Sequence, residues 1–376
     1  MQNARRAVRA TLLVVLVAIG IGACGSTSSS SKNAGVAAAS SGGSSSSGQG
    51  TAAPKTGFKI GYAVPVLANP YWEQNVAFAR KMASELGISL VVENANSAED
   101  TQLKNIEDLV AQGVKGIVFG PITGSIGPAI LKVCQQNNLV CAAMARKPGP
   151  EPDGSNQNYY AGYVVGNDYG DGQRTAQALD QAGATNCVAM SGQLGNSVAD
   201  DRLRGFDDYA KAHGMDVLST YRPAELAQDG QQATENFLAQ LPGPKFNCAF
   251  GFDGDVGTGT IAALTKAGVL NKVKVATMDT NPTNIQDIEN GSLLGSAASG
   301  EYIDGGLAEI LVYDGINGHL RSTRAIVLDG TVVTKANVAK YATQFGSGNP
   351  PSYDAKQLSL TYNPNAGNGG MQVVLK

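Results

Sequence analysis

The chain has 376 residues, with 28 Lys and Arg against 31 Asp and Glu, so its formal net charge is -3 when His is neutral. It carries no basic run or patch, which argues against nucleic acid as a partner. Neither of its two histidines, His213 and His319, has sequence neighbours that suggest a metal site or a catalytic triad. No Gly-x-Ser-x-Gly, His-Glu-x-x-His or Gly-Lys-Ser/Thr motif occurs, so we expect no catalysis, no bound metal and no cofactor.

The chain begins with a pattern typical of export. Three arginines precede an apolar run from Leu12 to Ile21, which is too short to span a bilayer and has the layout of a secretory signal. Small residues and then Cys24 follow, an arrangement that resembles the bacterial lipobox. We predict a lipoprotein signal peptide over residues 1–23 and lipidation of Cys24, which would anchor the protein to the outer face of the cell membrane. The alternative is an ordinary signal peptide with an incidental Cys.

Residues 24–57 are almost entirely Ser, Gly, Ala and Thr, and we predict a flexible tether there. The chain from residue 58 onward is long enough to form two lobes with separate cores.

Strands and helices alternate through the first part of this body. Ile60, Tyr62 and Val64 mark a strand, Asn69-Pro70 ends it, and a helix runs from Trp72 until Gly87 stops it. The further predicted elements are a strand at Ser89–Val92, a helix at Thr101–Gln112, a strand at Gly116–Phe119, a helix at Ser125–Asn137, a strand at Val140–Met144 and an extended stretch at Tyr160–Val165.

The same alternation then restarts, which predicts an α/β fold of two doubly wound, Rossmann-like lobes with a hinge and a ligand cleft between them. The predicted helices are Gly170–Gln181, Ala199–His213, Gly230–Gln240, Gly257–Ala267, Asn284–Asn290 and Tyr302–Asn317, and the strands between them are Cys187–Met190, Val217–Thr220, Cys248–Phe250, Val273–Thr277 and Leu294–Ala298.

We assign residues 58–165 and 299–328 to the first lobe and residues 166–298 and 329–345 to the second. Chain crossings are expected near Val164–Asn167, Ala298–Gly300 and Val327–Gly330. Residues 346–376 are rich in Gly, Asn and Pro, and we interpret them as a surface tail with a short final strand at Met371–Leu375.

Four cysteines remain after Cys24, and an even count in an exported protein indicates disulfides. Cys134 ends a helix and Cys141 begins the next strand, whereas Cys187 and Cys248 open two strands at matching places. We favour the pairs Cys134–Cys141 and Cys187–Cys248, with buried free thiols as the alternative.

Asn69, Tyr71 and Trp72 lie where the first strand turns into a helix. In open α/β sheets, ligands bind at the carboxyl ends of the strands. An aromatic pair beside an amide suits a ligand with an apolar face and a hydroxyl edge, such as a sugar. The alternative is that Tyr71 and Trp72 only pack the helix onto the sheet.

The segment Gly257-Thr-Gly259-Thr-Ile-Ala262 imitates a dinucleotide fingerprint, with Asp279 twenty residues after Gly259. We interpret these glycines as allowing close packing at a tight turn, because the exported context argues against NAD.

Four motifs, in order and with matching spacing, carry a family resemblance: Asn69-Pro-Tyr-Trp72, Arg202-Leu-Arg-Gly-Phe206, Ala276-Thr-Met-Asp279 and Val332-Val-Thr-Lys-Ala-Asn-Val338. From about Phe58 to about Tyr341 the chain resembles the ribose/galactose-type periplasmic binding proteins, the sugar-capturing subunits of bacterial ABC importers. The resemblance implies a monomer that encloses a small sugar-like ligand and partners an ABC permease and its ATPase.

The resemblance also implies ligand-binding residues. In this family the aromatics at Tyr71 and Trp72 would sandwich the sugar ring, and the amide of Asn69 would bond a hydroxyl. The remaining implied ligand-binding residues are Arg146, Arg202, Asp253, Asp279 and Ser299, the last as a polar residue near a hinge, with Glu301 as the alternative.

Two positions depart from the family pattern: Gly120 replaces an Asn, and Ala145 replaces the Asp that precedes Arg146. Both changes leave space, and the second removes the neighbouring carboxylate from Arg146. We therefore expect a ligand other than ribose; a larger sugar, a polyol, a cyclitol or a sugar acid all fit. A sugar-responsive repressor is disfavoured because a signal peptide and tether stand where a helix-turn-helix would lie. Import and sensing, in which the protein passes the sugar signal to a membrane receptor, both remain open.

Overall fold

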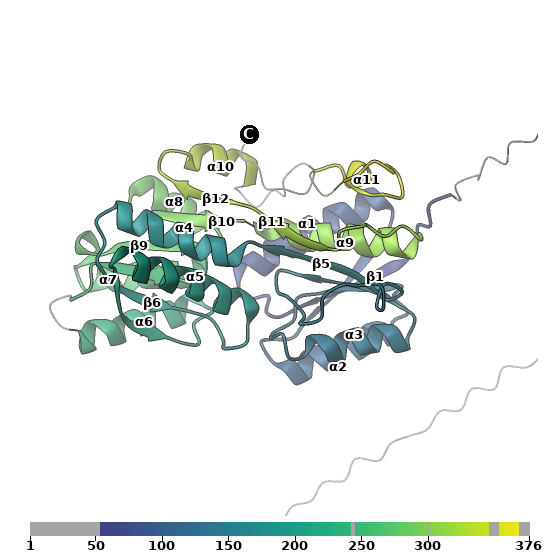
Figure 1. The fold of residues 1–376 in the computed structure, drawn as a ribbon, viewed down its shortest axis with the longest axis horizontal. Coiled ribbons are helices and arrows are strands. Elements are labelled where there is room, and N and C mark those ends of the chain that lie inside the picture. The colour runs from purple at the N-terminus through teal and green to yellow at the C-terminus, as the bar shows by residue number, and fades with distance from the viewer. Residues whose placement is uncertain (1–52, 242–244, 300, 346–352, 368–376) are drawn as a thin grey trace, which may run out of the picture. The chain divides into compact units, whose positions relative to one another are not determined.

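The computed structural model describes residues 53–241, 245–299, 301–345 and 353–367. Within these residues the strands form two six-stranded sheets flanked by helices, so the predicted α/β architecture is confirmed. Figure 1 shows the two sheets side by side, each with its own set of helices. The predicted signal peptide, Cys24, most of the tether and the final strand at Met371–Leu375 lie outside the described residues.

The first sheet has the strand order β11-β5-β4-β3-β1-β2, and all of its neighbouring strands are parallel. Helices α1 and α9 cover one face, while α2 and α3 cover the other (Figure 1). The elements of this first lobe are β1 Lys59–Val64, α1 Pro70–Leu86, β2 Ser89–Asn94, α2 Glu99–Ala111, β3 Gly116–Phe119, α3 Gly127–Gln136, β4 Val140–Met144, β5 Tyr160–Gly166, α9 Asp304–Ile316 and β11 Ala325–Leu328.

The second sheet has the order β12-β10-β9-β8-β6-β7, and its edge strand β12 is antiparallel to β10. Helices α4 and α5 pack together, as do α6 and α7. The elements of this second lobe are α4 Asp168–Gln181, β6 Asn186–Met190, α5 Ser197–His213, β7 Asp216–Tyr221, α6 Ala227–Gln240, β8 Cys248–Gly251, α7 Gly254–Lys266, β9 Lys274–Met278, α8 Pro282–Asn290, β10 Gly295–Ala298, β12 Thr331–Thr334 and α10 Val338–Phe345.

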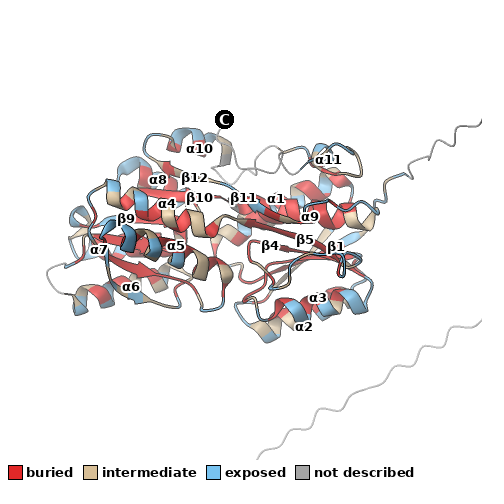
Figure 2. Ribbon diagram, in the orientation of Figure 1, coloured by how far each residue is buried: buried red, intermediate tan, exposed pale blue. Residues whose placement is uncertain are grey.

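The strands of both sheets and parts of the helices that cover them are buried (Figure 2), and the buried apolar residues form the core. Central strands such as β3 and β8 are buried along their whole length, as expected of parallel strands covered on both faces. The predicted helices and strands match the observed ones to within a few residues. Strands β11 and β12 and helices α10 and α11 (Ala355–Leu358) were not predicted as elements, because each is short.

The chain passes between the two sheets at three places: after β5, after β10, and between β11 and β12. These crossings contact one another. The Asn167 side chain donates to Asp329 over 3.0 Å, and the Asn167 backbone donates to the Leu328 carbonyl. A Cβ on Gly330 would lie 1.7 Å from the Ala298 carbonyl oxygen, so only glycine fits where the strands cross.

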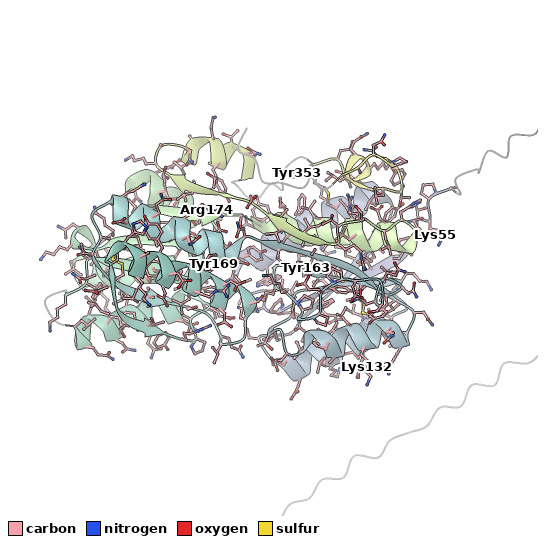
Figure 3. All side chains as sticks on the ribbon, viewed as in Figure 1. Lys55, Lys132, Tyr163, Tyr169, Arg174 and Tyr353 are labelled. Carbon is pink, nitrogen blue, oxygen red and sulfur yellow. A yellow bond between two sulfur atoms is a disulfide. The ribbon has the colours of Figure 1, made fainter. Side chains whose placement is uncertain are left out.

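Residues 353–367 return to the first lobe. Tyr353, labelled in Figure 3, packs edge-on against Phe78 of α1. The buried carboxylate of Asp314 in α9 accepts hydrogen bonds from the hydroxyls of Ser359 and Thr361 and from the backbone of Leu360. This part of the predicted tail is therefore anchored at a buried acidic side chain.

No helix among the described residues is long and apolar enough to span a membrane.

Both predicted disulfides are present. Cys134 pairs with Cys141 at a sequence separation of 7, and Cys187 pairs with Cys248 at a separation of 61. Cys187 and Cys248 occupy matched positions on the adjacent strands β6 and β8, which places their Cα atoms 4.4 Å apart.

The two disulfides should contribute unequally to stability, because closing a longer loop removes more entropy from the unfolded chain. We expect the Cys187→Ala/Cys248→Ala variant to lose about 4 kcal/mol in the free energy of unfolding, and the Cys134→Ala/Cys141→Ala variant about 2 kcal/mol. Denaturant titrations of the oxidised proteins measure both values. An equal loss, or the reverse order, would contradict this account.

Candidate ligand-binding site

A cavity lies between the two lobes, where the carboxyl ends of several strands meet, and its empty volume is about 540 Å³ including the mouth. Seven of the eight predicted ligand-binding residues line it. The full lining is Val66, Asn69, Tyr71, Trp72, Ala145, Arg146, Gly166, Asp168, Val198, Arg202, Glu225, Phe252, Asp253, Asp279 and Asp304.

Ser299 is the predicted residue that the structure places elsewhere. Its buried hydroxyl donates to the carboxylate of Asp171, which also pairs with Arg174. Ser299 directly follows β10 at a chain crossing, so in this structure it ties the crossing to α4 and does not line the cavity.

Asn69 and Asp253 come from opposite lobes and both act as helix N-caps. The Asn69 side-chain oxygen accepts from the Tyr71 N–H over 2.9 Å, and one Asp253 oxygen accepts from the Val256 N–H over 2.8 Å. Capping satisfies the free N–H groups at the helix start and fixes both side chains. Their remaining polar atoms meet across the cleft, where Asn69 Nδ2 donates to Asp253 Oδ2 over 3.0 Å.

The aromatic pair is arranged differently from the expectation. The rings of Tyr71 and Trp72 meet edge to face, with centroids 5.1 Å apart and planes at 84°. The expected sandwich by this pair is therefore wrong, because no gap for a sugar ring exists between them. The second lobe contributes another aromatic lining residue, Phe252, so the cavity takes aromatic surface from both lobes.

Gly120 does not leave free space, contrary to the expectation. A Cβ at this position would lie 2.6 Å from the Trp72 indole, so the ring already occupies the room that a side chain would need. Trp72 is 4% exposed and has the Arg146 guanidinium 5.7 Å from its ring centroid. The missing side chain at 120 thus sets the position of Trp72 and does not enlarge the ligand's compartment.

Arg202 is the most fully paired cation of the site. Nε donates to Asp168 over 2.9 Å, Nη1 donates to the Phe252 carbonyl and to Asp279, and Nη2 donates to Asp279 over 2.8 Å. Burial lowers the pKa of Arg202, but Asp279 and Asp168 outweigh it and hold that pKa well above its ordinary value. A guanidinium has five N–H groups, so within the described residues one remains for a ligand.

Arg146 is buried, and it has a partner that the sequence did not indicate. Nη1 donates to the Ile122 carbonyl over 3.0 Å, and Nη2 lies 3.9 Å from Glu225 of the other lobe. Burial lowers the pKa of Arg146, and Glu225 opposes that shift. The carboxylate missing at Ala145 is thus replaced in space by Glu225.

Three buried carboxyl groups of the site have raised pKa values. Burial raises the pKa of Asp168 to about 7 against the opposing charge of Arg202. Burial raises the pKa of Asp304 to about 8, although Tyr71, Gly305 and Asn75 donate hydrogen bonds to it. Burial also raises the pKa of Asp253 well above its ordinary value. The cavity is therefore poorly solvated. A ligand that donates hydrogen bonds to these carboxyl groups would stabilise their ionised forms.

Among the lining residues that sequence reasoning missed, four have a charged or aromatic side chain: Asp168, Glu225, Phe252 and Asp304. Asp168 and Asp304 each begin a helix just after the chain crosses between lobes, and this position in the sequence could have marked them as site residues. Phe252 directly precedes the predicted Asp253. Glu225 lies in an irregular loop before α6, and no sequence pattern marks it.

Ala145 and Asp279 follow the ends of β4 and β9 and have left-handed backbone angles, with φ of 59° and 57°. Non-glycine residues adopt this conformation at a cost and concentrate at functional sites. Both lie in the cavity wall, which supports a binding role for this region. Among the described residues, no group of three or more His, Cys, Asp or Glu is arranged to hold a metal ion.

The raised pKa of Asp304 predicts a pH dependence of stability. Between its unfolded pKa of about 4 and its folded pKa of about 8, the folded state binds more protons, so stability falls as pH rises through this window. The Asp304→Asn variant should lose a slope of up to about 1.4 kcal/mol per pH unit. Denaturant titrations of the ligand-free protein from pH 5 to 8 measure it, with Asp108→Asn on the surface as the control. An unchanged slope in Asp304→Asn would refute the assignment.

Comparison with known proteins agrees with this geometry. Residues 60–318 match the family model of the periplasmic binding protein domain. A ribose import binding protein of Haemophilus influenzae is 24% identical over 254 residues, which cover 67% of this chain and 83% of the relative.

Two solved structures share the fold. A solute-binding protein of an ABC transporter from Agrobacterium vitis, bound with α-D-tagatopyranose, has a TM-score of 0.69 at 20% identity and covers 75% of this chain and 96% of its own. A second, from Bacillus halodurans with bound myo-inositol, has a TM-score of 0.68 at 18% identity and covers 77% of this chain and 98% of its own. Because the family model matches well over half of its length, this chain belongs to the periplasmic binding protein domain family.

Proposed function

We propose that this protein is an extracytoplasmic solute-binding lipoprotein that captures a neutral sugar or polyol between its lobes and delivers it to an ABC importer. The observation that carries the proposal is the cavity itself, in which aromatic rings, an amide, carboxylates and guanidinium groups from both lobes converge. Hydroxyl groups both donate and accept hydrogen bonds, so carboxylates accept from their O–H groups while N–H groups donate to their oxygen lone pairs. The relatives named above support the class of solute.

The charge of the cavity favours a neutral ligand over a sugar acid. Five carboxyl groups line it against two guanidinium groups, and both guanidiniums already have carboxylate partners. An anionic ligand would enter a poorly solvated space in which neither guanidinium is free to pair with it, and this disfavours its charge.

Contacts between the lobes support capture by closure. Besides the Asn69–Asp253 bond, the backbone of Lys147 donates to Ser197 over 3.0 Å, and the Lys147 ammonium lies 3.3 Å from Asp201. A ligand that touches both lobes binds the closed form preferentially, and a differential affinity of about 5.5 kcal/mol moves the closed population from 1% to 99%.

The membrane attachment rests on the sequence alone. Cys24 follows the apolar segment of the export signal, and a Ser- and Gly-rich tether joins it to the folded body. We propose lipidation of Cys24, a monomeric state, and a position on the outer face of the cell membrane. The alternative role is that of a sensor passing the ligand signal to a membrane receptor. Loss of ligand uptake on deletion of the gene favours import; intact uptake with a lost transcriptional response favours sensing.

The only Trp of the sequence, Trp72, provides the first test. Titration of the lipid-free body with hexoses, pentoses, polyols and cyclitols should give a saturable change in tryptophan fluorescence with one group of compounds, because Trp72 lines the cavity. Asp279→Asn should weaken that binding about 10- to 100-fold, the cost of losing a charged hydrogen bond.

The surface variant Asp108→Asn is the matched control and should bind like the wild type. A folded protein that responds to none of these compounds would contradict the carbohydrate proposal and direct the search to amino acids, nucleosides or other small polar solutes.

The preference for a neutral ligand is tested by matched pairs. Each hexose that binds should bind at least about tenfold more tightly than its uronic acid, because the acid adds a charge next to the carboxyl groups. Glu225→Gln should narrow this difference by releasing Arg146 for the anionic ligand. Calorimetry of the pairs against both proteins gives the ratio. Equal or tighter binding of the uronic acid by the wild type would reject a neutral ligand.

A further inference from the structure

A second, smaller cavity adjoins the candidate site. It shares Asn69, Tyr71, Asp253 and Asp279 with the first cavity. Its empty volume, including open solvent at the mouth, is about 270 Å³, half that of the first. The hydrogen bond from Asn69 to Asp253 joins two of the residues that both cavities share.

The Asn69 amide makes two hydrogen bonds to the other lobe: Nδ2 donates to Asp253 Oδ2 over 3.0 Å and to the Glu225 carbonyl over 3.2 Å. The Asn69 oxygen and one Asp253 oxygen are occupied by capping α1 and α7, which leaves Asn69 Nδ2 and Asp253 Oδ2 as the atoms that meet across the cleft. A ligand hydroxyl inserted here would accept from the amide and donate to the carboxylate. Such an insertion replaces the bond without leaving either partner unsatisfied.

Most residues that line the second cavity alone have polar side chains, although the surface exposed inside this cavity is mostly apolar. Gln74 comes from α1, Asp255 from the start of α7, and Thr280 and Asn281 from the segment before α8. Among the described residues, the Thr280 hydroxyl has no hydrogen-bond partner, and Thr280 is only 4% exposed. Buried hydroxyls are rarely left unpaired in folded proteins, so an unpaired one in a cavity wall indicates a missing polar partner.

We propose that the second cavity is a subsite for a short hydroxylated arm on the ligand, so that the preferred solute is a ring with a polyol substituent, such as a glyceryl glycoside. The inference rests on the proposed function and adds to it the size and shape of the ligand. The ring lies in the first cavity beside Trp72 and Arg202. The arm passes the Asn69–Asp253 position and places a hydroxyl within reach of Thr280.

The test compares three forms of one sugar: the free sugar, its methyl glycoside and its glyceryl glycoside, with galactose and glucose as the rings. Calorimetry should show that the wild type binds the glyceryl glycoside at least tenfold more tightly than the methyl glycoside. Thr280→Val keeps the side-chain shape and removes the hydroxyl, and should reduce this ratio to below threefold with methyl glycoside affinity unchanged.

The matched control is Thr260→Val. Thr260 is also buried, but it lies in α7 and its hydroxyl donates to the Val256 carbonyl, so the ratio should stay as in the wild type. Gln74→Phe is a second variant, which fills the second cavity from a residue absent from the first, and it should abolish the preference for the arm.

The outcomes separate the two proposals. Binding of free sugars or methyl glycosides with no gain from the glyceryl arm would overturn the subsite and leave the proposed function intact. A gain that survives both Thr280→Val and Gln74→Phe would also overturn the subsite. A folded protein that binds none of these compounds would overturn the proposed function and the subsite with it.

Discussion

The buried guanidinium of Arg202 is the interaction on which the second lobe's binding surface depends. It joins Asp168, just past a chain crossing, to Asp279 after β9 and to the Phe252 carbonyl after β8. These three segments are far apart in the sequence, and without a common partner their carboxylates would repel one another in a poorly solvated space. Arg202 therefore positions the aromatic and acidic walls while spending all but one of its N–H groups within the described protein.

The general architecture could be predicted from the sequence because it depends on repeated local patterns. Alternating apolar strands and amphipathic helices indicate a doubly wound sheet whatever the tertiary detail. The disulfides were predictable for a related reason, since Cys187 and Cys248 open strands that parallel pairing brings into register. Asn69 was found because it lies where the first strand gives way to a helix, at the edge where such sheets bind ligands. Asp253 was found through the family resemblance.

The rest could not be predicted because it depends on which residues of different lobes meet in space. Glu225 lies in an irregular loop, and only the facing of the lobes brings it to Arg146. The departure at Gly120 was interpreted as free space, but the Trp72 ring fills it. Ser299 was expected in the cavity and instead ties a crossing to Asp171. Each error arose because the surroundings of a residue were inferred from its own segment, whereas residues from distant segments determine them.

The contacts at the two ends of the folded body have a consequence for how a tethered protein moves. Lys55 lies in the short part of the predicted tether that the structure describes, and it donates hydrogen bonds to Asn317 and Ile316 at the end of α9. Residues 353–367 pack on the same helix through Asp314. The predicted tether therefore joins the folded body at the first lobe. In the membrane-anchored arrangement proposed above, the first lobe would be the one held near the membrane, and the second lobe, with Arg202 and Asp279, would be the one that moves on closure.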